Sequence, residues 1–102
     1  MAKVLALYKK PADAAAFDAY YYDNHVPLAK TLPGLRSYEV SVGPVGTPAG
    51  EAALHLVAIL GFDSVAAVQA ALGSAEGATV AGDLANFAQA GVELLIFDTK
   101  EV

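Results

Sequence analysis

His25 is the residue of this sequence best suited to acid–base chemistry, and it follows two aromatic residues at helical spacing. Tyr21 precedes it by four residues and Phe17 by eight. Residues four apart lie on one face of an α-helix, so a helix here would stack these three rings together. Such a face carries a phenol and an imidazole where a protein core normally holds aliphatic side chains. The segment around His25 is therefore the candidate site.

Two roles are open for this histidine. An imidazole near neutral pH is suited to act as a general base or acid, and Tyr21 would then orient it or bind an oxygen of a ligand. Alternatively, His25 and Tyr21 are core residues that satisfy each other or a carbonyl group left free by Pro27. A cavity of roughly 300 Å³ or more beside His25 would favour the first role, and a filled interior the second.

Three apolar or aromatic residues are candidates for substrate binding next to this pair. Phe17 and Leu28 lie on the same helical stripe as Tyr21. Tyr8 belongs to the first predicted strand and is a candidate wall of the pocket. A plain core role is the alternative for each of them. Tyr20 and Tyr22 point away from Tyr21 on a helix and are expected at the surface or at an interface.

His55 is the second histidine of the chain and the fourth candidate for substrate binding. It lies in a strand segment, with the same parity as Val57 and Ile59. Its imidazole would therefore face either the helix-side pocket or the core of a dimer. A structural histidine is the alternative.

Composition excludes several classes of protein. The chain has 102 residues, a formal charge of −5 and no cysteine, which predicts one domain spanning residues 1–102 and disfavours nucleic acids and anionic membranes as partners. No apolar run approaches the roughly 20 residues of a membrane span. With two histidines, no cysteine and no acidic residue at ligand spacing, no metal site is expected. No motif implies a cofactor, and a cytoplasmic location is the default expectation.

Apolar periodicity and turn residues predict the elements that must position the site. Residues 3–9 and 53–62 are apolar on both parities and predict strands covered on both faces. Asp13 is the expected N-cap of a helix that runs to Leu32 and is interrupted at Pro27. Further strands are expected over residues 35–45 and 92–97, a loop over 43–50, and helices over 65–72, after Asp63-Ser64, and from about 79 to 90.

The order strand-helix-strand, hairpin, strand-helix-strand predicts an α+β domain. It is typical of the ferredoxin-like split βαβ fold, in which two helices cover one face of a four-stranded antiparallel sheet. The other face would be apolar here, and a second copy of the chain is the simplest way to bury it. We therefore expect a homodimer whose two sheets form a dimeric α+β barrel.

The sequence resembles the EthD family, named for ethyl tert-butyl ether degradation, within the dimeric α+β barrel superfamily. The most specific part of the similarity is the spacing F-x-x-x-Y-x-x-x-H-x-P-L. The residues that carry it are Phe17, Tyr21, His25–Ala29, Leu32–Leu35, Tyr38 and Gly61–Ser64.

The resemblance implies a fold and a dimer more firmly than a reaction. Relatives in the superfamily include muconolactone isomerase, cofactor-free monooxygenases and polyketide cyclases, which bind aromatic or polyketide-like ligands between helices and sheet. By this similarity, His25 and Tyr21 would be catalytic in a cofactor-independent oxidoreductase or a proton-transfer enzyme of the isomerase or cyclase type. Its ligand would be an aromatic or lipophilic intermediate of a degradation pathway. The alternatives are a non-catalytic structural or stress-associated dimer and an accessory subunit of an oxygenase system.

Overall fold

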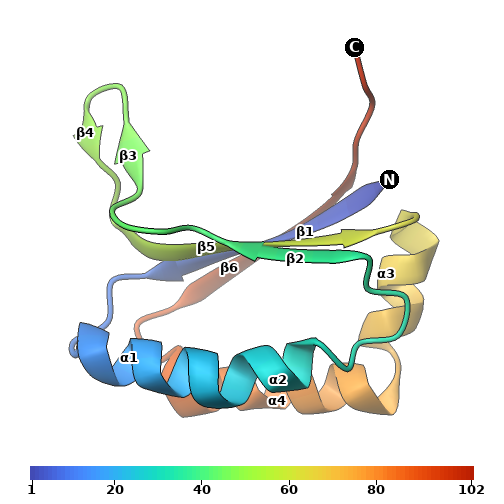
Figure 1. Cartoon of the computed structure of the whole chain (residues 1–102), viewed down its shortest axis with the longest axis horizontal. Helices are drawn as coiled ribbons and strands as arrows, with labels where there is room; N and C mark the ends of the chain where they lie inside the picture. Colours follow the sequence, from blue (N-terminus) through green and yellow to red (C-terminus); the bar gives the residue numbers. More distant parts are fainter.

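The protein folds into two layers, a sheet and a group of helices that covers one face of it (Figure 1). The computed structural model describes all residues from 1 to 102. The sheet strands are β1 (Ala2–Lys9), β2 (Ser37–Val40), β5 (Leu54–Phe62) and β6 (Val92–Asp98). They lie in the order β2-β5-β1-β6, and every neighbouring pair is antiparallel. The predicted ferredoxin-like fold is confirmed.

The helices begin at side-chain caps that the sequence indicated. Along the chain, α1 (Ala14–Tyr20), a π-helical turn η1 (Tyr21–His25) and α2 (Val26–Ala29) form one continuous rod, and α3 (Val65–Leu72) and α4 (Ala75–Phe87) follow β5. Asp13 accepts a hydrogen bond from the backbone N–H of Ala16 at 3.0 Å, and Ser64 accepts one from Ala67 at 3.0 Å. These bonds satisfy N–H groups that a helix start leaves without partners.

The sheet has one face buried by helices and one face that the single chain leaves open. Along β1, Val4, Ala6 and Tyr8 are buried against the helices, and the alternate residues are only half-buried. Leu5 lies opposite Ile59 on one side and Leu95 on the other. We call the open side the outer face; its apolar residues are Leu5, Leu7, Val57, Ile59, Leu95 and Phe97.

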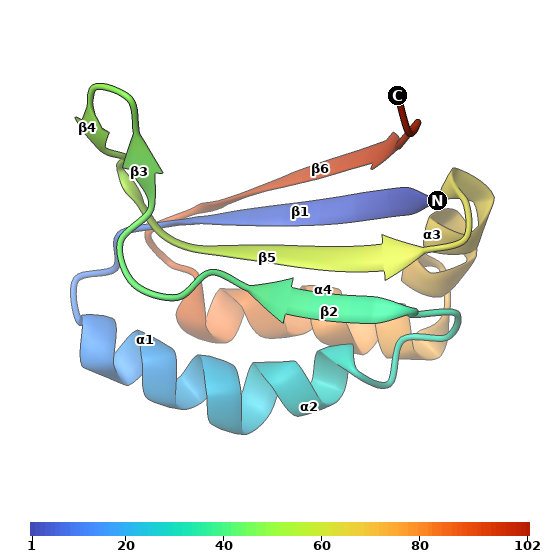
Figure 2. The ribbon, with the colours of Figure 1, turned by 45° about the horizontal axis from the view of Figure 1, so that its top comes forward.

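Two segments project from the sheet on the side of the outer face. One is the ribbon of β3 (Gly46–Thr47) and β4 (Gly50–Glu51), where the sequence predicted only a loop. The other is the C-terminal tail after β6, and the two stand at opposite ends of the sheet (Figures 1 and 2). β2 is shorter than the predicted strand over 35–45, because the chain leaves the sheet after Val40 to reach this ribbon.

α4 starts earlier than its glycine residues suggested. The sequence predicted a helix only from about residue 79, two residues after Gly77. Instead, Ser74 caps a helix that begins at Ala75 and contains Gly77. A β-carbon at Gly77 would lie 2.3 Å from the carbonyl oxygen of Ala71. The glycine is therefore a packing residue that lets α4 start against the end of α3.

Two glycine substitutions in α4 should act in opposite directions. Gly77→Ala should lower the free energy of unfolding by about 1–3 kcal/mol, because its methyl group would overlap backbone atoms of α3. Gly82→Ala should raise it by up to about 1 kcal/mol, since alanine favours the helix and its β-carbon meets no atom within 4 Å. Urea unfolding curves of the two variants measure this, and equal effects would contradict the packing role of Gly77.

Candidate functional site

An apolar cavity of about 80 Å³ lies between the sheet and the helices. It is lined by side chains from β1, β2, β5, the helical rod and α4. His25 is the one lining residue that is not hydrophobic. Leu72 and Leu94 line it while remaining 40% and 49% exposed, so they mark its mouth. The volume is well below the roughly 300 Å³ of a drug-sized site. The single chain therefore has room only for a molecule of a few heavy atoms.

A π-helical turn places His25 at this cavity. The backbone N–H of Val26 bonds to the carbonyl of Tyr21, five residues back, where an α-helix would use a residue four back. This wider turn gives the ring of Pro27 room beside the carbonyl of Asp23, with which it would clash in a regular helix. The predicted interruption is thus a local widening, and the rod continues through Pro27 to Ala29. His25 is the last residue of the wide turn.

His25 is held by a buried carboxylate from the opposite helix. Its Nδ1 lies 2.9 Å from Oδ2 of Asp83, and both side chains are at least nine-tenths buried. Oδ1 of Asp83 accepts hydrogen bonds from the Tyr20 hydroxyl at 2.6 Å and the Asn86 amide at 3.0 Å. Burial alone would raise the pKa of this carboxyl, but the bonds from Tyr20, Asn86 and His25 together hold the pKa below its ordinary value.

This bond determines which nitrogen of His25 meets the cavity. An ionised carboxylate only accepts, so Nδ1 of His25 carries a proton. In the neutral imidazole the lone pair then lies on Nε2. Nε2 makes no hydrogen bond within the chain, and no buried side-chain nitrogen or oxygen lacks a partner, so this atom keeps accessible surface. Of the hollows of the molecule, His25 lines only the cavity described above.

Three phenols surround the cavity together with His25. The hydroxyls of Tyr21 and Tyr38 are 2.6 Å apart and share one hydrogen bond. Tyr8 lines the same cavity, and its ring packs edge-on against that of Tyr21 at 5.5 Å. Burial raises the pKa of Tyr8, Tyr21 and Tyr38, and the bond to Tyr38 raises that of Tyr21 further. The three groups therefore stay neutral and able to donate.

The structure brings together some of the predicted site residues and separates others. His25, Tyr21 and Tyr8 line the cavity. Phe17 lies behind them, with its ring stacked on Tyr21 at 5.9 Å, and does not reach the cavity. Leu28 is half-buried and also lies outside it; its neighbour Ala29 is a lining residue instead. The functional roles of these residues stay predictions.

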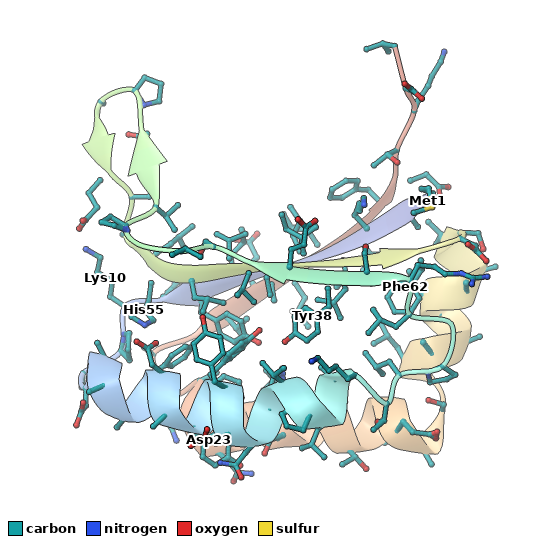
Figure 3. The ribbon with its side chains drawn as sticks, viewed as in Figure 1. Met1, Lys10, Asp23, Tyr38, His55 and Phe62 are labelled. Atoms are coloured by element: carbon teal, nitrogen blue, oxygen red, sulfur yellow. The ribbon has the colours of Figure 1, made fainter.

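His55 lies on the helix side of the sheet but away from the cavity. Tyr8 pairs with Leu56 and Lys9 with Leu54, so His55 is the extra residue of a β-bulge. The bulge turns its ring toward α1, where Nε2 lies 2.7 Å from Oδ1 of Asp18. Parity with Val57 would have placed it on the outer face. In Figure 3 it is seen at the end of the sheet that carries Lys10, whereas Tyr38 points into the space between the layers.

Sequence reasoning missed Asp83, and it placed Tyr20 wrongly. Tyr20 was expected at the surface or an interface, but it is half-buried and donates to Asp83. A signal for Asp83 was present: it occupies an apolar position of the stripe Val80, Asp83, Leu84 and Phe87. A carboxylate on the buried stripe of a helix needs partners in the interior. Tyr38 is among the residues that carry the resemblance but was not predicted as a site residue.

An α+β domain with an imidazole and three phenols around an apolar cavity is the kind of structure found in proteins that bind small molecules. The sequence profile of the EthD domain matches residues 9–91, and the chain belongs to this family. It is 37% identical over 103 residues to an uncharacterized 11.0 kDa protein of Rhodococcus erythropolis, covering 100% of this chain and 98% of the other. A crystal structure of an EthD family protein from Bacillus halodurans is 35% identical, with a TM-score of 0.89 over 98% of this chain and 99% of that one.

Two enzymes share the fold at much lower identity. The hydroxynitrile lyase from Passiflora edulis is 14% identical, with a TM-score of 0.75 over 99% of this chain and 94% of that one. SnoaB from Streptomyces nogalater, a cofactor-independent oxygenase, is 15% identical, with a TM-score of 0.67 over 99% and 94%. These likenesses show the fold alone.

No helix of this chain has the length and apolar character to cross a membrane, and no three potential metal-ligating side chains come together.

Replacing Asp83 should change the acid stability of the protein. The pKa of this carboxyl in the folded state lies below its ordinary value of 3.8. Its contribution to the free energy of unfolding is therefore complete above about pH 5 and is lost as the pH falls through the folded pKa. Asp83→Asn should lower the free energy of unfolding at neutral pH by about 1–3 kcal/mol. Its stability should then depend less on pH below about 4 than that of the wild type.

Thermal unfolding between acid and neutral pH measures this effect. The matched control is Asp23→Asn, because Asp23 is exposed, makes no hydrogen bond within the chain and points away from the sheet (Figure 3). Parallel acid profiles for the wild type and Asp83→Asn would show that the buried carboxylate is not the group described here.

Proposed function

We propose that this protein binds a small lipophilic molecule in the cavity and removes a proton from it, with Nε2 of His25 as the general base. The observation that carries the proposal is the hydrogen bond between Nδ1 of His25 and Asp83, which leaves Nε2 without a partner in a residue that lines the cavity. A base oriented by a carboxylate is a recurrent arrangement in proton-transfer sites. Asp83 acts here as a positioning residue, and Tyr21 is the predicted partner of the base.

The surroundings of His25 support this role. An apolar cavity has a low effective dielectric constant, so the hydrogen bond to Asp83 and any bond to a ligand are stronger there than in water. As Nε2 takes up a proton, positive charge develops on the ring, and the adjacent carboxylate stabilises it. Tyr8, Tyr21 and Tyr38 line the same cavity, and a phenol hydroxyl that turns toward the ligand would donate to its oxygen.

Proton removal also fits the two reaction types expected from the sequence. An isomerase or cyclase returns the proton elsewhere, and a cofactor-independent oxidation can begin from the same carbanion. Among the fold neighbours, SnoaB is a cofactor-independent oxygenase and the Passiflora protein a hydroxynitrile lyase, which supports small-molecule chemistry on this fold. At 14% and 15% identity they identify no substrate for this chain.

We also propose that the functional unit is a homodimer joined through the outer face. Leu5, Ile59 and Leu95 form a row across three neighbouring strands on this face, with no helix over them. Leu95 and Phe97 are each 39% exposed in the single chain. The β3–β4 ribbon and the C-terminal tail project on the same side, so a second sheet packed there would lie between them (Figure 2). Burial of this surface would stabilise the pair by the hydrophobic effect.

The second candidate is a non-catalytic dimer in which the polar residues only satisfy one another. The small volume of the cavity, about 80 Å³, favours this alternative. In this alternative, the hydrogen bonds of Asp83 only hold the rod against α4, and the bond between Tyr21 and Tyr38 is an ordinary hydrogen bond of the core. The two candidates differ in whether a small molecule binds next to His25.

Substituting His25 separates the two candidates. His25→Ala should abolish ligand-induced thermal stabilisation and lower any proton-transfer rate by about a hundred-fold or more, the usual contribution of a general base. The dimer should remain intact, because His25 is not on the outer face. Thermal shifts with a panel of small lipophilic molecules, and solvent-proton exchange followed by NMR, provide the measurements. Unchanged affinity and exchange in this variant would leave the non-catalytic dimer as the better account.

A charge on the outer face should dissociate the proposed dimer. Ile59→Lys places an ammonium group in the centre of that face, where burial of an unpaired charge is costly. Sedimentation velocity at micromolar concentration should show a dimer for the wild type and a monomer for Ile59→Lys. The control Gln69→Lys adds the same charge on the exposed side of α3. A wild-type monomer, or a dimer unaffected by Ile59→Lys, would contradict the proposed interface.

A further inference from the structure

The hydrogen-bonding groups around the cavity define the chemistry of a ligand that would fill it. The surface of the cavity is almost entirely apolar, and the polar groups of its lining residues are the hydroxyls of Tyr8, Tyr21 and Tyr38 and the unpaired ring nitrogen of His25. The other lining side chains are hydrocarbon. A matching ligand would therefore place its polar atom at one of these groups and be apolar elsewhere, because an unpaired polar group in such a cavity costs free energy.

At least one phenol proton is left over for the ligand. Tyr21 and Tyr38 share a single hydrogen bond, so one hydroxyl of the pair donates and the other keeps its own proton free. Even if the Tyr8 hydroxyl extends the row, hydrogen bonds among three hydroxyls in a row use at most two of their three protons. The raised pKa values of these phenols keep the protons in place. The phenol side of the cavity thus offers a donor, and Nε2 of His25 offers an acceptor.

A charged ligand does not fit these surroundings. No Asp, Glu, Lys or Arg lines the cavity, and Asp83, which is bonded to the lining residue His25, already accepts bonds from Tyr20, His25 and Asn86. The carboxylate of Asp83 would repel an anion in the cavity. It cannot bind a cation there directly, because His25 lines the cavity and Asp83 does not. The ligand is therefore neutral, with one oxygen that accepts from a phenol.

Size restricts the ligand further. The cavity of about 80 Å³ is roughly half of the 150 Å³ that accommodates benzene in an engineered protein cavity. The enclosed part of the ligand is accordingly a short aliphatic group. A longer chain would have to pass between the exposed side chains of Leu72 and Leu94 at the mouth.

We infer that the cavity binds a short aliphatic carbonyl compound, with its oxygen at the phenols and an adjacent C–H at Nε2 of His25. This inference rests on the proposed function of His25 as a base and names the substrate class for it. The C–H proton moves to Nε2, and the electron pair of that bond becomes the C=C bond of an enolate. The charge that develops on the oxygen is stabilised by the donated phenol O–H. Return of a proton from the imidazolium regenerates the carbonyl compound.

Acetone in deuterated water is a direct probe of this step. Each cycle of proton removal and return replaces a methyl hydrogen by deuterium, which NMR detects without knowledge of the natural reaction. Tyr8→Phe and Tyr38→Phe remove a hydroxyl and keep the ring. At least one of them should slow the exchange by about a hundred-fold, the effect of losing one donor to a developing oxyanion. Tyr22→Phe is the matched control, because Tyr22 is exposed and does not line the cavity.

Binding supplies a readout that is independent of exchange. A hydrogen bond from a phenol should move the carbonyl carbon resonance of bound acetone downfield in the wild type and in Tyr22→Phe. The movement should be smaller in the phenylalanine variant that slows exchange. Isopropanol, which can accept from a phenol and donate to Nε2 but has no acidic C–H, should bind without exchange. Isobutane, with the same branched shape and no oxygen, should bind more weakly than either.

The outcomes separate this inference from the proposed function. If acetone binds with a shifted carbonyl resonance but neither exchanges nor responds to His25→Gln, the base role is overturned and carbonyl recognition stands. If exchange depends on His25 but neither phenylalanine variant changes it, carbonyl recognition by the phenols is overturned and the base role stands. Equal binding of isobutane and acetone, or no binding of acetone, would also overturn the inference.

Discussion

The arrangement of the two helices over the sheet depends on a single buried carboxylate. Asp83 accepts hydrogen bonds from Tyr20 and His25 on the first helical rod and from Asn86 on its own helix. An ionised group in an apolar interior is costly unless donors surround it. Because two of the three donors come from the other helix, the carboxylate is satisfied only when the rod and α4 pack side by side. The interaction therefore fixes the helix layer and the orientation of His25 at once.

The wide turn of the rod follows from the same requirement. Tyr21 and His25 face the sheet together, although Pro27 lacks the N–H that would bond to the carbonyl of Asp23 and its ring would clash with that carbonyl in a regular α-helix. The π-turn absorbs one residue at this place, and the rod keeps its direction across the proline. Turns of this kind are frequent at functional sites. Here the turn spans Tyr21 and His25, and both residues line the cavity.

Much of this structure could be predicted from the sequence, since it depends on local rules. Strand alternation, the caps at Asp13 and Ser64 and the spacing of Tyr21 and His25 all involve residues near one another in the chain. The partner of His25 could not be predicted in this way, because Asp83 lies 58 residues away and its position depends on how α4 packs. The orientation of His55 was equally inaccessible, because one extra residue in a strand reverses the parity of those beyond it.

β6 links the two proposed features of the protein. Its residues alternate between the faces, so Leu94 lines the mouth of the cavity and its neighbour Leu95 lies on the outer face. β6 is an edge strand, and its residues from Glu93 onward are exposed in the single chain. A second copy packed on Leu95 would restrict the motion of this strand and, with it, the position of Leu94. Under these two proposals, ligand entry and dimer formation would be mechanically coupled through one strand, and a dimer would bind a small molecule with a more rigid mouth than a monomer.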